Sequence, residues 1–140
     1  MNFFDKLRFL FGPDRKAELE KLGFDIDGLV TFKEGLYSVY GTVNFTLEAK
    51  RLPANFYEVT GDFICSYNGL NTLAGSPVIV GGDFYCSGNN LTDLNGCPNE
   101  IHGTLYCGHN PLKSGEGLKK VFGRIDSDLD LSAYAIPTIN

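Results

Sequence analysis

Apolar and polar residues alternate in short units that recur through the middle of the chain. The letters GDFICSYNGLNTL, which begin at Gly61, return as GDFYCSGNNLTDL from Gly82. In each unit a Phe and a Cys stand two residues apart, which is the spacing of a β-strand that turns one face toward a core. An Asn and two Leu follow at fixed distances. The pattern predicts a short strand, a turn at the Asn, and a return segment whose leucines cover the core from the other side.

A shift of 21 residues superimposes three copies of this unit. The aligned positions are Gly61, Gly82 and Gly103; Phe63, Phe84 and Leu105; Cys65, Cys86 and Cys107; Asn68, Asn89 and Asn110; and Leu70, Leu91 and Leu112. A unit of about 20 residues is too short to bury its own apolar face, so neighbouring units must stack. We expect the asparagines to form a ladder by bonding backbone groups of neighbouring coils.

Weaker copies flank these three, GTVNF at Gly41–Phe45 and GRI at Gly123–Ile125. The sequence therefore predicts a leucine-rich-repeat-like solenoid with parallel β-strands, stacked in about five coils of 20–21 residues. We assign it to residues 25–140, with clear repeats over 59–112. From Arg124, RIDSDLDLSAY alternates polar and apolar residues, which predicts a final strand whose acidic side chains discourage edge pairing.

The N-terminal residues 1–24 have the pattern of a helical cap that belongs to the same domain. Phe3, Phe4, Leu7, Leu10 and Phe11 fit one face of an amphipathic helix. A second helix is expected with Pro13 at its first position and its end before Gly23. The alternative is that the first helix docks on a partner or a membrane.

The repeat unit, G-D-F-x-C-S-x-N-x-L-T-x-L-x-G-x-P, resembles that of short leucine-rich-repeat-like solenoid proteins found in tailed phages and some bacteria. The resemblance is close over Val59–Leu112, after which KSGEGLKK replaces the end of the motif. It implies a protein-binding role, and for a phage-type protein it implies binding that inhibits or modulates a host protein.

Composition narrows the possible partners. The 140 residues include 12 Lys and Arg against 17 Asp and Glu, a formal charge of -5 that would repel a nucleic-acid backbone. No apolar run approaches the roughly 20 residues needed to cross a bilayer, and Asp5, Lys6 and Arg8 interrupt any signal-peptide core. We therefore expect a cytoplasmic protein that binds neither nucleic acid nor membrane.

The four cysteines are the first candidates for chemistry. Cys65, Cys86 and Cys107 occupy the inward strand position, which favours core packing, and no C-x-x-C pair exists. A metal site that combines Cys97 with His102 or His109 is a weaker alternative. No nucleophile elbow, H-E-x-x-H or phosphate-binding loop occurs, so we expect no enzyme, cofactor or metal site.

The outward face of the strands remains as the candidate site. Its central column contains Ile64, Tyr85 and Tyr106, the neighbouring column contains Asp62 and Asp83, and Tyr67 and His109 lie at the rim. Tyrosines are enriched at interfaces, so we predict that this face binds a protein with a basic surface. Two alternatives remain open. The tyrosines could only stabilise the strand ladder, and the protein could have a structural role in which it self-associates or docks in a larger complex through its C-terminal edge.

Overall fold

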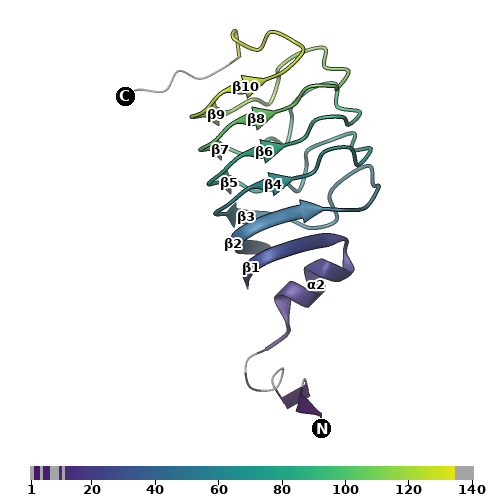
Figure 1. Ribbon diagram of the computed structural model, residues 1–140, viewed down its shortest axis with the longest axis vertical. Coiled ribbons are helices and arrows are strands. Elements are labelled where there is room, and N and C mark those ends of the chain that lie inside the picture. The colour runs from purple at the N-terminus through teal and green to yellow at the C-terminus, as the bar shows by residue number, and fades with distance from the viewer. Residues whose placement is uncertain (1, 4, 7–9, 11, 135–140) are drawn as a thin grey trace.

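The computed structural model describes residues 2, 3, 5, 6, 10 and 12–134. Figure 1 shows a stack of parallel strands that rises from a helix near the N-terminal end to the last coil at the C-terminal end. The solenoid has about four turns, and one helix, α2 (Arg15–Lys21), lies beneath it. The prediction of a repeat solenoid with an N-terminal helical cap is confirmed.

Eight short strands make up the turns. They are β3 (Phe56–Val59), β4 (Phe63–Ile64), β5 (Ile79–Val80), β6 (Phe84–Tyr85), β7 (Glu100–Ile101), β8 (Leu105–Tyr106), β9 (Lys120–Val121) and β10 (Ile125–Asp126). Pairing is parallel within two ladders, one of β4, β6, β8 and β10 and the other of β3, β5, β7 and β9. We call them the even ladder and the odd ladder.

A long hairpin occupies the position where the first of five coils was expected. Strand β1 (Phe24–Lys33) pairs antiparallel with β2 (Leu36–Phe45), and the turn at Glu34 and Gly35 has positive φ at both residues. The segment Gly41–Phe45 is thus part of a ten-residue hairpin strand rather than a degraded coil. The first half of β2 pairs with β3 and its second half with β4, so this strand joins both ladders.

A column of glycines forms the corner between the two ladders. Four of them donate a backbone hydrogen bond to the glycine of the preceding coil, at 2.8 to 3.0 Å, along the series Gly41, Gly61, Gly82, Gly103 and Gly123. A Cβ atom on any of the last four would lie less than 3.0 Å from the backbone of the preceding coil. The repeated glycine is therefore required because the coils approach too closely at the corner for a side chain.

The inside of each coil is apolar, as the repeat predicted. Phe63, Cys65, Leu70 and Leu73 are completely buried, and their equivalents in the next coil are as well. Stacked phenylalanines continue from coil to coil, with the ring centroids of Phe63 and Phe84 5.7 Å apart. The inward and outward assignment of the strand residues is confirmed.

The predicted asparagine ladder is present. The Oδ1 atom of Asn89 accepts from the backbone N–H groups of Asn68 and Leu70, both at 3.0 Å. Its Nδ2 atom donates to the carbonyl oxygens of Cys65 and Cys86, both at 2.9 Å. Asn110 repeats the pattern toward the coil before it. Each amide thus ties two coils together inside the core.

The N-terminal cap differs in detail from the prediction. Asp14 is the N-cap of α2 and accepts from the N–H of Ala17 at 3.0 Å, so Pro13 lies outside the helix rather than at its first position. Leu19 is completely buried and closes the core at this end. The other expected helix, over residues 3–11, includes residues 4, 7–9 and 11, which lie outside the described part of the chain.

The predicted final strand from Arg124 is wrong beyond its start. Strand β10 contains only Ile125 and Asp126, after which the chain turns. The hydroxyl of Ser127 accepts from the N–H of Leu129 at 3.2 Å, and the carboxylate of Asp130 accepts from the N–H of Ser132 at 3.0 Å. These local bonds favour turns over a strand.

Candidate protein-binding face

The even ladder brings the predicted central column together. Ile64, Tyr85 and Tyr106 are paired in consecutive strands, as the alternation predicted, and Asn44 and Asp126 continue the column at its two ends. The rings of Tyr85 and Tyr106 stack with centroids 4.6 Å apart and planes 7° from parallel. Both rings are half-buried, so the stack presents its edges and hydroxyl groups to solvent.

The hairpin adds residues to this face that the sequence analysis missed. Asp25 lies opposite Asn44 and Asp27 lies opposite Thr42, which places both carboxylates at the N-terminal end of the two columns. Both are exposed. The signal was available in the alternation of Phe24 and Ile26 with Asp25 and Asp27, but the sequence assigns residues 25 onward to the coils.

Asp62 and Asp83 have a structural role that the prediction did not include. The Oδ1 atom of Asp62 accepts from the N–H of Asp83, and the Oδ1 atom of Asp83 accepts from the N–H of Thr104, each at 2.7 Å. The two aspartates therefore connect successive coils, as the asparagines do on the inside. The second oxygen of Asp83 also accepts from the hydroxyl of Tyr85 at 3.3 Å.

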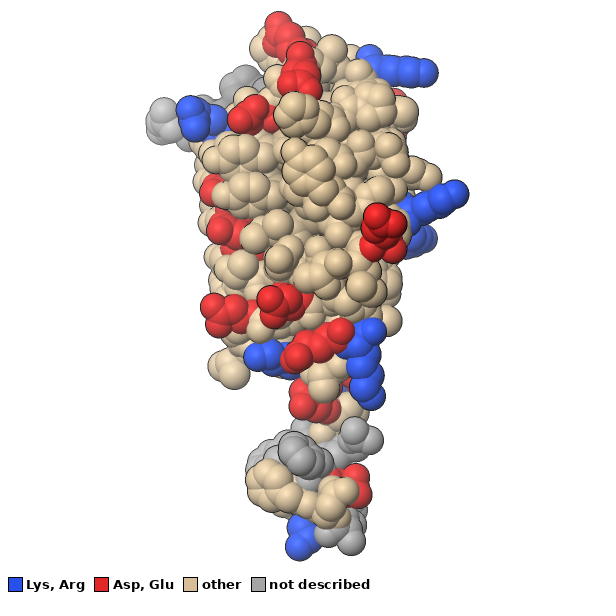
Figure 2. Space-filling view, turned by 45° about the vertical axis from the view of Figure 1, so that its right-hand side comes forward, with Lys and Arg blue, Asp and Glu red and all other residues tan. Residues whose placement is uncertain are grey.

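Carboxylates surround the tyrosine stack. The charged residues on the outward face of the even ladder and of the adjoining half of the hairpin are Asp25, Asp27, Asp62, Asp83, Arg124, Asp126 and Asp128. We call this surface, with its tyrosines, the acidic tyrosine face. Figure 2 shows red atoms along the left-hand side of the solenoid body, set among tan side chains. Desolvation, and the nearby Asp83 charge, raise the pKa of Tyr85, so its hydroxyl stays protonated and can donate.

Tyr67 and His109 lie in one column at the rim, with Gly88 between them. All three have positive φ, which costs a residue other than glycine about 1 kcal/mol. The Tyr67 ring is 69% exposed and lies over Gly88, where a Cβ would come within 2.2 Å of it. The two copies therefore differ here for a packing reason. The absence of a side chain at Gly88 makes room for the exposed ring of Tyr67.

The cysteines do not form a reactive site. All four are free and buried, and burial raises the pKa of each thiol, that of Cys97 to about 12. Within residues 2, 3, 5, 6, 10 and 12–134 no group of three or more His, Cys, Asp or Glu side chains is arranged to hold a metal ion.

Comparisons with protein-family models, curated proteins and solved structures give no match. Across the part of the chain that the structure describes, the helices are too short or too polar to cross a bilayer.

Proposed function

We propose that this chain is a non-enzymatic protein-binding module that holds a basic surface of its partner against the acidic tyrosine face. The observation that carries the proposal is the charge of that face, where six carboxylates and one guanidinium surround a stacked tyrosine pair. Because the ladder fixes the backbone, a partner meets a preorganised surface and little entropy is lost on binding. Opposite charge accelerates the encounter, and the tyrosines supply contact area.

Exposure divides the face into residues that support the fold and residues that are free to meet a partner. Asp62 and Asp83 already accept hydrogen bonds from the next coil, and Asp128 accepts from the N–H of His109 at 2.7 Å. Asp25 and Asp126 are exposed and make no such bond among the described residues. We therefore assign most of the electrostatic contact with the partner to Asp25 and Asp126.

An affinity experiment tests the assignment. The full chain, immobilised, is compared with a variant that combines Asp25→Lys, Asp126→Lys and Tyr106→Ala, using lysate of the native host and mass spectrometry. The matched control, Glu48→Lys with Glu116→Lys, makes the same charge change at exposed positions off the even ladder. A protein that the wild type and the control retain and the face variant loses supports the proposal. Equal retention by all three chains refutes it.

The resemblance to phage and bacterial solenoids supports a more specific proposal, in which the partner is a cytoplasmic host protein whose activity is inhibited or modulated by binding. Steady-state assays of the captured protein with and without the chain test this proposal. Unchanged activity at saturating chain concentration would contradict it.

A structural role is the second candidate, because the last coil is less completely covered than the others. Val121, Ile125, Leu129 and Leu131 line a groove of about 410 Å³ at the C-terminal end. Stacking of another molecule on this end would bury the half-buried side chains of Val121, Ile125 and Leu129 further. Light scattering that shows assemblies in the wild type and none in Ile125→Lys would support it, and a monomeric wild type would not.

A further inference from the structure

The outer edge of the hairpin has backbone groups that the fold leaves unpaired. Within the described part of the chain β1 pairs only with β2, and Gly23, just before it, accepts from the N–H of Thr46 at 2.8 Å. Because residues alternate in direction along a strand, Gly28, Val30 and Phe32 point their N–H and C=O groups away from β2. Among the described residues these groups make no hydrogen bond. The second half of β1 is thus an open strand edge.

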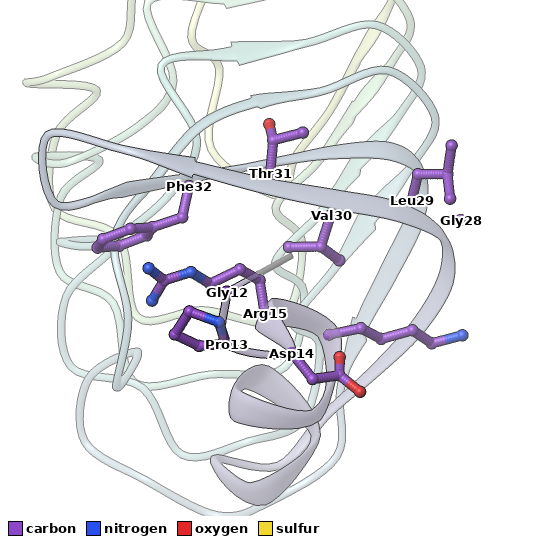
Figure 3. Close-up of a pocket in the computed structure, with 10 residues that line it drawn as sticks. Gly12, Pro13, Asp14, Arg15, Gly28, Leu29, Val30, Thr31 and Phe32 are labelled. Atoms are coloured by element: carbon purple, nitrogen blue, oxygen red, sulfur yellow. The ribbon is translucent and has the colours of Figure 1, made fainter. Parts of the chain in front are cut away.

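A groove of about 580 Å³ runs along this edge. Gly28–Phe32 form one wall, and Gly12–Lys16, at the start of α2, form the other. Figure 3 shows Phe32 and Arg15 on the two sides of the groove, with the guanidinium near the ring. The Cζ atom of Arg15 lies 4.3 Å from the ring centroid of Phe32. This cation–π contact connects the two walls at Phe32, and the groove beside it follows the edge at Gly28–Thr31.

Outward side chains along β1 are exposed, and the charged ones among them have no ion-pair partner among the described residues. Leu29 is 76% exposed, more than any other large apolar side chain in the described part of the chain, and it lies opposite Tyr40, which is 55% exposed. Asp27 and Lys33, on the same side of β1, are exposed and form no ion pair within the described residues. The strand therefore has one unpaired charge of each sign at either end of an exposed apolar residue.

We propose that a second copy of the chain occupies this edge, with the segments Gly28–Phe32 of the two copies paired antiparallel about a two-fold axis at Val30. In this register Val30 faces Val30 and Gly28 faces Phe32, and each such pair exchanges two backbone hydrogen bonds. Asp27 then faces Lys33 of the second copy, and the symmetry repeats this contact at the other end.

The charges of β1 favour a second copy over an unrelated peptide. An antiparallel segment that pairs with both Asp27 and Lys33 needs a cation opposite Asp27 and an anion opposite Lys33, six residues apart. A second β1 strand has its own Lys33 and Asp27 at that spacing. A shift by two residues in one direction places Lys33 opposite Leu29 and loses both ion pairs. A shift in the other direction places Asp27 opposite Thr31 and Lys33 opposite Asp25, and it would also need the edge groups of Ile26, in the first half of β1, to pair. The pairing also covers Leu29, which lies beside Thr31 of the other copy.

Sedimentation equilibrium of the full chain over a wide concentration range tests the proposal. The wild type is expected to dimerise reversibly. Lys33→Asp places carboxylates opposite one another at both ends, and we expect it to weaken dimerisation about tenfold or more. The double variant Asp27→Lys with Lys33→Asp restores the pairs and should return the dimer constant to within about threefold of the wild type. A wild type that stays monomeric overturns the proposal, as does a dimer that Lys33→Asp leaves unchanged.

Amide hydrogen exchange gives an independent measurement on the wild type. The N–H groups of Val30 and Phe32 should exchange more slowly as concentration rises, because only the dimer pairs them. The N–H of Thr31 points toward β2 and should be equally protected at every concentration, which makes it the internal control. Exchange at Val30 that does not depend on concentration overturns the proposal. The dimer uses Asp27, which also belongs to the acidic tyrosine face, but Lys33→Asp and the exchange measurement leave that face unchanged, so loss of the dimer and loss of partner binding are measured separately.

Discussion

The asparagine ladder allows a quantitative prediction, because the same substitution in two neighbouring coils removes different numbers of hydrogen bonds. Asn89 satisfies two N–H groups with its Oδ1 atom and two carbonyl groups with its Nδ2 atom, all of them buried. Asn68 donates to the carbonyls of Phe45 and Leu47, but its own Oδ1 atom has no hydrogen-bond partner among the described residues.

The expected magnitudes follow from this difference. A buried backbone group left without a partner costs about 1–3 kcal/mol. Asn89→Ala leaves three such groups, because the carbonyl of Cys86 keeps its bond from Asn110 at 3.0 Å, so we expect the free energy of unfolding to fall by about 3 kcal/mol or more. Asn68→Ala leaves two carbonyl groups and at the same time removes an unsatisfied oxygen, so its cost should be about 1–2 kcal/mol.

Urea unfolding followed by circular dichroism measures both values. With a slope of about 2 kcal/mol per molar urea, the midpoint of Asn89→Ala should lie about 0.5 M or more below that of Asn68→Ala. Equal slopes for the two variants would show that the comparison is between similar unfolded states. Equal midpoints would refute the assignment of the stabilisation to these particular bonds.

Three further predictions concern other features of the fold. The folded state raises the pKa of the four buried thiols, so their contribution to stability is complete below about pH 8.5 and is lost as the pH rises above it. The melting temperature should therefore stay constant up to that pH and fall steeply beyond it, as the free energy of unfolding drops by up to about 5 kcal/mol per pH unit. A thiol reagent should label no cysteine before unfolding. Gly41→Ala sets a Cβ against the carbonyl of Asp27 at positive φ and should abolish folding or lower the melting temperature by more than 10 °C, a roughly 3 kcal/mol effect, whereas the solvent-facing Gly35→Ala should cost only about 1 kcal/mol. Gly88→Ala should displace the Tyr67 ring and cost about 2 kcal/mol, and a second substitution, Tyr67→Ala, should reduce that cost in a double-mutant cycle; additive effects would contradict the packing of the ring on Gly88.

The repeat made most of the solenoid predictable. Residues such as Phe63, Cys65 and Asn68 recur because each coil places them against the same neighbours, so aligning the copies gives the inward positions, the ladder and the outward column directly. Their physical roles depend only on the neighbouring coils, so the repeat alone was sufficient to predict their positions in the solenoid.

The hairpin could not be recognised in the same way, because it occurs once. Its turn, Glu34–Gly35, lacks the Asn-Gly signature, and its bend depends on Gly28 and Gly41 lying opposite each other, a relation that only the pairing reveals. The bonds of Asp62 and Asp83 across coils depend in the same way on how closely the coils stack. The sequence showed that these carboxylates recur but not that Asp62 uses one oxygen and Asp83 both oxygens for hydrogen bonds within the fold.

Strand β2 has a consequence for the order in which the chain acquires its structure. A two-residue turn brings β1 and β2 together within a short length of chain, and hairpins form in microseconds. Since β2 is the partner of both β3 and β4, this early hairpin supplies the template edge for the first turn, and each completed turn supplies the next. During synthesis on the ribosome the hairpin leaves the exit tunnel first, so the solenoid can add one coil at a time outside the tunnel. Until the next coil covers it, the newest coil is the least stable part of the molecule.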